Sequence, residues 1–147
     1  MRGFTVIELI VVLVLVGVVA LTALPRFFDT RDFTGQGFYD ELISAVRFGR
    51  ATAVASGCSV QVRITSSPAG YGLFQRATDC TTGAYTRAVP HPSQSGDFAD
   101  NAPNGITVTA ATLTFDGYGR ADADATVTVA GSRILDVVAA TGYVRRR

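Results

Sequence analysis

The sequence lacks several residue types, and each absence removes a class of function. It contains no tryptophan, one histidine, two cysteines and no lysine, so all thirteen basic residues are arginine. One histidine cannot build a histidine-rich metal site, and two thiols alone cannot complete a zinc ribbon. Because twelve acidic residues leave a net charge of only +1, no overall charge points to nucleic acid or to a cationic partner.

The composition that is present fits one folded domain. The chain has 147 residues, of which 48% are hydrophobic and 17% charged, and its mean hydropathy is +0.28. Disordered chains show the opposite balance, and this length suits a single modest domain. The hydrophobic residues are concentrated near the N-terminus, so that segment decides much of the interpretation.

An apolar block occupies residues 4–24 and is interrupted only by Glu8. A helix of this length is about 32 Å long, which matches the hydrocarbon core of a bilayer, and we expect it to span a membrane. A secretory signal peptide is the first alternative, but it needs a small residue at its cleavage site where Leu21 stands. A plain membrane anchor is the second alternative, and it leaves Glu8 unexplained.

Glu8 is the most informative residue of this block. A carboxylate at the centre of a bilayer costs roughly 2.5–3.5 kcal/mol, and somewhat less near the interface. One interpretation is an interfacial acid whose side chain reaches the lipid headgroups. The other is a carboxylate that awaits a cation from another chain, so that assembly neutralises it.

The residues around Glu8 resemble the class III signal of type IV pilins and pseudopilins. The matching features are the run Arg2-Gly3-Phe4-Thr5-Val6-Ile7-Glu8-Leu9-Ile10, the apolar block and Pro25. The resemblance implies that prepilin peptidase cleaves between Gly3 and Phe4, and that Phe4 becomes the N-methylated terminus. It also implies that Glu8 pairs with the terminal amine of a neighbouring subunit as a filament grows.

The helical pattern continues beyond the apolar block, so one helix is expected over residues 4–55. Pro25 has no N–H and clashes with the preceding turn, so it should kink this helix. Gly35 and Gly37 lie in a polar stretch where the helix should bend or fray. Gly57 is a suitable stop. The expected buried face consists of Phe38, Leu42, Ala45, Val46, Gly49, Ala53 and Val54.

The rest of the chain predicts a sheet, and the whole predicts an α+β, pilin-like fold. In this fold a long N-terminal α-helix, with a transmembrane first half, packs on an antiparallel β-sheet domain. The predicted divisions are a leader at 1–3, a transmembrane and assembly half-helix at 4–28 and a periplasmic globular domain at 29–147. Residues 77–104 are expected to form a loop. The predicted strands are 59–65, 71–76, 106–109, 113–115, 126–130, 133–138 and 143–145.

The C-terminal third extends the resemblance. The runs Leu113–Gly119, Arg133–Val138 and Thr141–Arg145 are similar to those of the GspH/FimT group of minor pilins and pseudopilins. The helix segment 37–48 is similar to minor pilins of mannose-sensitive haemagglutinin (MSHA) pili. The resemblance implies a non-catalytic subunit of a type IV pilus or type II secretion pseudopilus, without a cofactor, that acts in filament initiation or assembly. Its partners would be other pilins, prepilin peptidase and the assembly platform of the bacterial inner membrane.

The C-terminus offers an alternative function, the capture of DNA. Arg145, Arg146 and Arg147 could neutralise about three phosphates, which supports only weak, salt-sensitive binding. Tyr143 could stack on a base. It stands where members of the FimT group that serve DNA uptake carry the first arginine of a Gly-Arg-x-Arg motif. The competing expectation is a frayed, solvated basic tail.

Cys58 and Cys80 are candidates for a disulfide. Export across the membrane would place them in an oxidising compartment, where two thiols usually pair. Closing the loop between them would stabilise the fold by roughly 3 kcal/mol. Two free buried thiols are the alternative, and a redox-active pair is not expected without C-x-x-C spacing.

Acidic residues and the single histidine indicate neither a metal site nor an enzyme. Asp116, Asp122 and Asp124 do not have the spacing of an EF-hand loop, so we expect a solvated turn rather than a calcium site. His91 lies between two prolines and is expected to be an exposed loop residue. No nucleophile–base pair is recognisable, which disfavours an enzyme.

Overall fold

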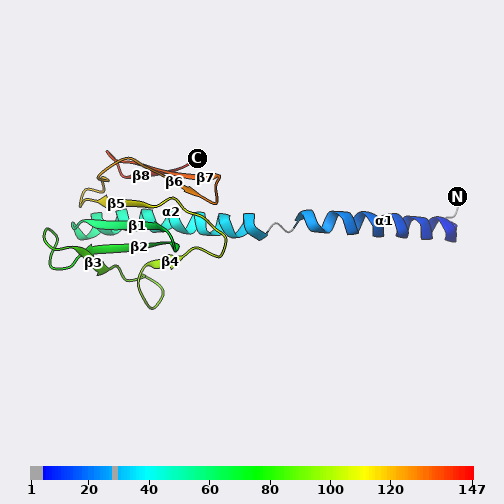
Figure 1. Ribbon diagram of the computed structural model, residues 1–147, viewed down its shortest axis with the longest axis horizontal. Coiled ribbons are helices and arrows are strands. Elements are labelled where there is room, and N and C mark those ends of the chain that lie inside the picture. The colour runs from blue at the N-terminus through cyan, green and yellow to red at the C-terminus, as the bar shows by residue number, and fades with distance from the viewer. Residues whose placement is uncertain (1–4, 28–29) are drawn as a thin grey trace. The chain divides into compact units, whose positions relative to one another are not determined.

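Two helices occupy the N-terminal part of the chain (Figure 1). The structure, a computed structural model, describes residues 5–27 and 30–147, with side chains for 5–20 and 32–147. These residues fall into two units, 1–33 and 34–147. Helix α1 (Val6–Phe27) lies in the first unit, and helix α2 (Thr30–Ser56) belongs to the second from Thr34 onward. The predicted cleavage site at Gly3–Phe4 lies outside the described residues.

Helix α1 is apolar, and its described side chains are exposed. The exposed fraction of its large apolar side chains runs from 49% for Ile10 to 76% for Val6. Within the described residues, no helix combines the length and the apolarity needed to cross a membrane. The span predicted over residues 4–24 begins outside them and stays a prediction. Helix α1 continues through Pro25 to Phe27, and the kink predicted at Pro25 also stays a prediction.

Helix α2 buries one face because apolar residues recur on it every three or four positions. One expectation for this face was wrong, because Val54 is 49% exposed. Ile43, which was not among the residues expected on this face, is fully buried. The helix ends one residue before Gly57, whose φ of +67° suits a helix stop, as predicted. The buried residues of α2 are Gly35, Phe38, Tyr39, Leu42, Ile43, Ala45, Val46, Gly49 and Ala53.

The helix does not fray at Gly35 and Gly37, since α2 runs without interruption from Thr30 to Ser56. Gly35 is buried, and a Cβ placed on it would lie 3.2 Å from Cβ of Ala130 and 3.5 Å from Cδ1 of Ile106. The helix backbone therefore packs closely on the sheet domain at this point. Such packing offsets the weak helix propensity of glycine.

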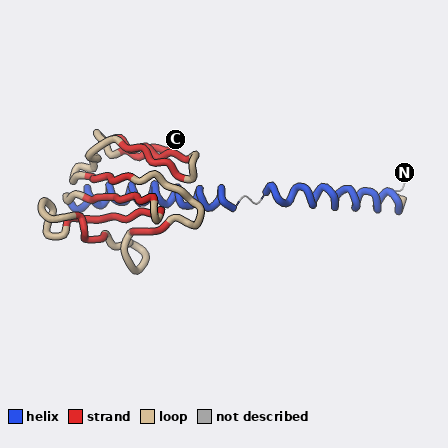
Figure 2. The backbone as a smooth tube through the Cα atoms, viewed as in Figure 1, coloured by secondary structure: helices blue, strands red, loops and turns tan. Residues whose placement is uncertain are grey.

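Eight strands follow α2 and form two antiparallel sheets (Figures 1 and 2). The first sheet has the order β3-β2-β1-β5, and β4 pairs with β2 beside β3. The second has the order β6-β7-β8. The strands are β1 (Val60–Ser66), β2 (Ala69–Arg76), β3 (Tyr85–Ala88), β4 (Ala99–Asn101), β5 (Ala111–Phe115), β6 (Ala125–Val129), β7 (Arg133–Val138) and β8 (Tyr143–Arg146).

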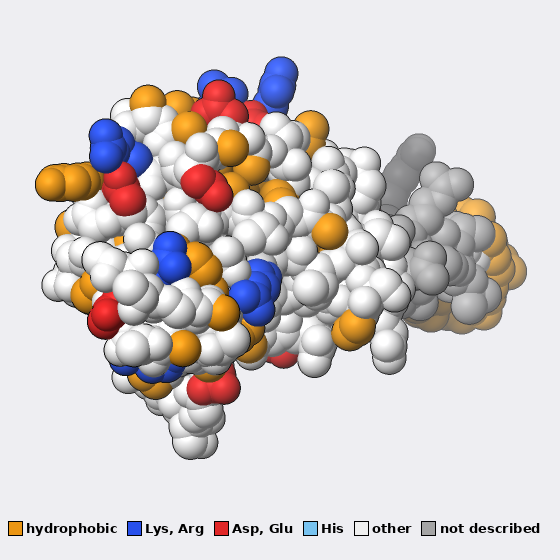
Figure 3. Space-filling view, turned by 60° about the vertical axis from the view of Figure 1, so that its left-hand side comes forward, with side chains coloured by type: hydrophobic (Ala, Val, Ile, Leu, Met, Phe, Trp, Pro, Cys, Tyr) orange, Lys and Arg blue, Asp and Glu red, His pale blue; other side chains and the backbone are white. Residues whose placement is uncertain are grey.

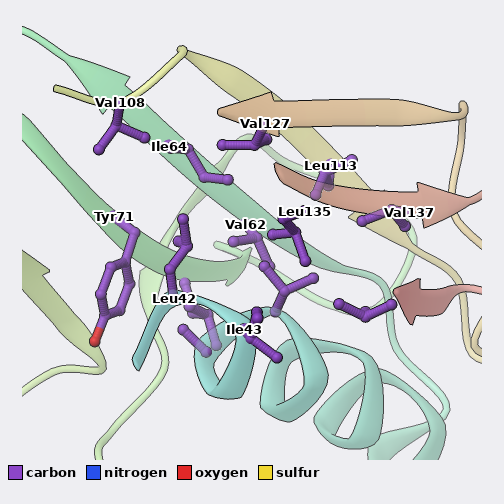
Figure 4. Close-up of a cluster of buried hydrophobic side chains, with 14 of the residues drawn as sticks. Leu42, Ile43, Val62, Ile64, Tyr71, Val108, Leu113, Val127, Leu135 and Val137 are labelled. Atoms are coloured by element: carbon purple, nitrogen blue, oxygen red, sulfur yellow. The ribbon is translucent and has the colours of Figure 1, made fainter. Parts of the chain in front are cut away.

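The core of the domain lies where α2 faces both sheets. In Figure 4, Leu42 and Ile43 of the helix point toward strand side chains that include Val62 of the first sheet and Leu135 of the second. All four side chains are inaccessible to solvent. Alternation along β1 supplies this face, because Val60, Val62 and Ile64 are buried while the residues between them are half-exposed. The predicted α+β fold, a helix packed on an antiparallel sheet, is confirmed.

The strand predictions were wrong in two places. Residues 77–104, expected as a loop, contain β3 and β4, which pair with β2. Residues 106–109, expected as a strand, contribute only an isolated bridge between Val108 and Val129. The side chains of Ile106 and Val108 are nevertheless buried, so their apolarity reflects core packing rather than a full strand. The other predicted strands agree with the structure to within two residues at each end.

Candidate functional site

The first candidate site is the start of α1. The backbone N–H of Glu8 donates to the carbonyl of Thr5 at 3.1 Å and lies 3.4 Å from its hydroxyl, which begins the helix. The Glu8 side chain is exposed in the first turn, where the helix dipole favours a negative charge. Within the described residues Glu8 forms no ion pair with a cation of its own chain. This end of the helix therefore carries an apolar surface with one available carboxylate.

The disulfide between Cys58 and Cys80 is present, with Cα atoms 4.6 Å apart and the cysteines 22 residues apart in sequence. It joins the connection that follows α2 to the loop that follows β2. The same loop is organised by Asp79, which accepts hydrogen bonds from the backbone N–H groups of Thr81 and Thr82 at 2.7 and 2.6 Å. These bonds hold the pKa of Asp79 well below its usual range. The disulfide thus fixes a defined loop beside the sheet.

Arg145 and Arg146 lie in strand β8, and the backbone N–H of Arg147 donates to the carbonyl of Ile134 at 3.0 Å, so the expectation of a frayed tail was wrong. Arg145 lies 3.1 Å from Oδ2 of Asp136, and Arg147 lies 3.7 Å from the same oxygen. The Thr126 hydroxyl donates to Oδ1 of Asp136 at 2.8 Å. Hydrogen bonds from Thr126 and then Arg145 lower the pKa of this carboxyl, and the Asp136 side chain is only 11% exposed. Two of the three terminal arginines are therefore paired within the fold.

Arg146 pairs with a different carboxylate, and Tyr143 is exposed to solvent. Arg146 lies 2.8 Å from Oδ1 of Asp40 on α2, so the third terminal arginine is also paired. Tyr143 is 60% exposed, in line with the open ring that a stacking role requires. Charged side chains of both signs are interspersed on the face in Figure 3. The residues predicted to bind nucleic acid thus lie on β8 and directly after it, and carboxylates match the positive charges of the three arginines.

The acidic residues considered as a calcium site form hydrogen bonds with the backbone of turns. Asp116 accepts hydrogen bonds from the backbone N–H groups of Tyr118 and Arg120 at 3.0 and 2.9 Å. The pKa of Asp116 is lowered, chiefly by the bond from Arg120. Asp122 and Asp124 likewise accept from backbone N–H groups. Among the described residues no group of three potential metal ligands is found.

His91 lies in a loop, as predicted, but it is half-buried rather than exposed. Its ring stacks on Phe98 with centroids 4.7 Å apart, and Phe98 stacks on Phe48 of α2 at 4.6 Å. Its Nδ1 accepts hydrogen bonds from the backbone N–H groups of Ser93 and Gln94 at 3.2 and 3.1 Å. These contacts give His91 a structural role in the loop that precedes β4.

Sequence reasoning missed the polar residues that join α2 to the strands. Nε of Arg50 donates to the carbonyls of Gly119 and Thr141 at 3.0 and 3.2 Å, so one side chain joins two turns to the helix. The Tyr39 hydroxyl donates to the carbonyl of Ile134 at 2.6 Å. The only sequence signal was the presence of a tyrosine and an arginine on a mainly apolar helix. Their partners lie about 70 to 95 residues further along the chain.

The sequence is similar to a known protein family and to one known pilus protein. Residues 39–143 match the family described as Type II transport protein GspH. A relative from Thermus thermophilus, described as the type IV narrow pilus major component PilA5, is 37% identical over 71 residues. That match covers 47% of this chain and 61% of the relative, so the chain spans about three fifths of the relative's length.

Solved structures show the same fold. The type IV minor pilin FimU of Pseudomonas aeruginosa is similar with a TM-score of 0.55 and 15% identity, over 76% of this chain and 91% of that one. The minor pseudopilin EpsH from the type 2 secretion system of Vibrio cholerae is similar with a TM-score of 0.54 and 16% identity, over 79% and 94%. The family match over most of the chain shows that the protein belongs to the GspH family, within the minor pilins and pseudopilins of type IV pili or type II secretion.

Proposed function

We propose that the protein is a minor pilin or pseudopilin that enters a filament through its N-terminal helix. The observation that carries this proposal is α1, whose described apolar side chains are exposed and whose first turn carries Glu8. Apolar surface of this extent is stabilised by a lipid environment or by neighbouring helices. Other pilins or pseudopilins are therefore the partners of α1, and the second unit presents the outer surface of the subunit.

Before assembly, residues 4–24 hold the subunit in the bacterial inner membrane as a single pass with the C-terminal domain in the periplasm. Prepilin peptidase cleaves between Gly3 and Phe4 and methylates Phe4. The amine thus created is the cation that Glu8 requires, because a carboxylate in an apolar environment is costly until it is paired. Pairing between Glu8 of one subunit and the Phe4 amine of its neighbour, at the inner-membrane assembly platform, orders the subunits in the filament.

The proposed class is a minor subunit that acts in filament initiation or assembly. The solved neighbours FimU and EpsH are described as minor subunits, whereas the relative PilA5 is described as a major component. Quantitative mass spectrometry of sheared filaments distinguishes the two, since a minor subunit is a small fraction of the filament mass. The resemblance of residues 37–48 to minor pilins of MSHA pili makes an MSHA-type pilus the first system to examine.

The alternative of DNA capture gains no support from the structure. All three terminal arginines already pair with Asp136 or Asp40. A cation that is already paired contributes less to phosphate binding, because the internal ion pair must first be broken. The structural subunit is therefore the function that we propose.

The experiment is a substitution of Glu8. We expect Glu8→Gln to leave the amount of protein in the membrane unchanged and to lower its recovery in sheared filaments at least tenfold. The control is Asp97→Asn, which removes an exposed acid from the loop between β3 and β4. Recovery of the Glu8→Gln variant at the wild-type level would overturn the assembly role of Glu8.

A further inference from the structure

A pocket of about 300 Å³ lies where α2 meets β8, away from the residues used in the proposed assembly. Its walls are formed by Arg47 and Arg50 of the helix and by Gly142, Tyr143 and Val144 of the strand segment. Gly142 and Val144 are buried, whereas the ring of Tyr143 is 60% exposed. The pocket thus has two guanidinium groups, a small apolar wall and an accessible aromatic ring.

In the described part of the chain, the two arginines of the pocket have no carboxylate partner, unlike Arg120 and the three terminal arginines. Elsewhere Arg120 pairs with Asp116 at 2.8 Å, and the terminal arginines pair with carboxylates as described above. Among the described residues no acidic side chain forms an ion pair with Arg47 or Arg50. Arg47 contacts only the carbonyl of Val144, at 3.5 Å, and Arg50 contacts carbonyls through its Nε. Two positive charges therefore lie at one pocket without an internal counter-charge.

The fold holds this pocket in shape. The hydrogen bonds from Nε of Arg50 to Gly119 and Thr141 fix the position of its guanidinium group. Gly142 has a φ of +61°, and a Cβ at this position would collide with the carbonyl oxygen of Gly119 and approach Arg50. Any side chain at residue 142 would therefore displace the turn and Arg50. A pre-formed site loses less conformational entropy when it binds its ligand.

We infer that this pocket binds a carboxylate on an acidic peptide segment of a partner protein. Guanidinium groups bind carboxylates through paired, charge-assisted hydrogen bonds. The Tyr143 ring and Val144 supply apolar contact for the peptide that carries the acid. A nucleic acid is a poorer match, because its binding distributes many phosphates over a broad basic surface, whereas this pocket offers two unpaired cations on a chain of net charge +1.

The test uses the full chain in detergent micelles and a fluorescein-labelled tetraglutamate peptide. Binding is followed by fluorescence anisotropy at low salt, with a tetraglutamine peptide as the uncharged probe. We expect tetraglutamate to bind and tetraglutamine not to bind. Arg47→Gln should weaken tetraglutamate binding roughly tenfold, which is the usual effect of losing one charge-assisted hydrogen bond. Tyr143→Ala, which leaves both arginines in place, should weaken it to a smaller extent.

The matched control is Arg87→Gln, which removes an exposed arginine of β3 that contacts Gln75. Both variants lower the net charge by one, so equal weakening by Arg47→Gln and Arg87→Gln would overturn the proposal in favour of general electrostatic attraction. Tighter binding of a labelled oligothymidylate, lost in Arg47→Gln, would overturn it in favour of nucleic acid. The measurement needs neither cleavage at Gly3 nor filament assembly, so its outcome is independent of the proposed function.

Discussion

The hydroxyl of Tyr71 donates a hydrogen bond of 2.6 Å to Oε1 of Glu41, which joins the middle of β2 to α2. The tyrosine is only 7% exposed, and its ring lies near those of Phe38 and Phe98, with centroids 6.1 and 6.3 Å away. The ring of Tyr71 thus lies in the core, while its hydroxyl bonds the Glu41 carboxylate of α2. This contact belongs to the interface on which the position of α2 depends.

We predict that Tyr71→Phe destabilises the protein by about 1–2 kcal/mol, because the variant loses one hydrogen bond to a charged group while keeping the ring. Chemical denaturation followed by circular dichroism measures the free energy of unfolding. Tyr118→Phe is the control, since Tyr118 is 83% exposed and should change stability little. Equal stability of Tyr71→Phe and wild type would show that the bond to Glu41 contributes nothing net.

The same tyrosine predicts a dependence of stability on alkaline pH. Burial, followed by the hydrogen bond and the charge of Glu41, raises the pKa of Tyr71 above its ordinary value. In the unfolded chain a tyrosine ionises near pH 10, so above about pH 10 the unfolded state gains a stabilisation that the folded state lacks. The contribution of Tyr71 to stability should therefore be constant below that pH and fall above it. This part of the alkaline dependence should be absent in Tyr71→Phe.

Gly49 predicts a second effect on stability. A Cβ on Gly49 would lie 2.7 Å from Cγ2 of Val62, so Gly49→Ala should destabilise the domain by about 1–3 kcal/mol through overpacking. Gly37 is on the same helix with nothing within 4 Å of its added Cβ. Gly37→Ala should instead stabilise by about 0.5–1 kcal/mol, as expected for an exposed helix position. Thermal denaturation of the two variants should give shifts of opposite sign.

Asp136 predicts a loss of stability in acid. Its pKa is lower in the folded state, so its contribution is present above the unfolded pKa of about 4 and is lost as the pH falls below that value. The melting temperature of the wild type should therefore drop between about pH 5 and pH 2. Asp136→Asn should be less stable than wild type at pH 7 and show a smaller drop. A drop of the same size in both proteins would contradict the pairing with Arg145.

The disulfide predicts a response to reduction. Removal of a cross-link that closes a loop of this length should destabilise by roughly 3 kcal/mol. We expect the double substitution of Cys58 and Cys80 by serine to match the reduced wild type in stability. Addition of dithiothreitol should lower the melting temperature of the wild type only. Unchanged stability on reduction would mean that the loop after β2 is held by its other contacts.

Parts of the fold could be predicted because they follow a local period. The alternation of Val60, Val62 and Ile64 gave β1, and helical spacing gave most of the buried face of α2. Strands β3 and β4 could not be predicted, because they are four and three residues long and mostly exposed. Their extended geometry comes from pairing with β2, which no local pattern reveals.

The candidate sites likewise divide into those that a local sequence pattern reveals and those that depend on contacts between distant residues. Glu8 could be found because a charge interrupts an apolar block, and the signal is local. The pairing of Arg145 and Arg146 could not be found, because their partners Asp136 and Asp40 lie on other elements. Three arginines at a terminus suggest a solvated tail when only the sequence is read, whereas β8 pairs with β7, which carries Asp136, and Arg146 reaches Asp40 on α2.

The central claim is that the apolar N-terminal helix is retained after processing and joins the subunit to its neighbours. Intact-mass and peptide mass spectrometry of the protein extracted from membranes tests this most directly. The account predicts a mature chain that begins with N-methylated Phe4 and contains Glu8. A mature chain that begins near Leu24, without the apolar helix, would contradict it.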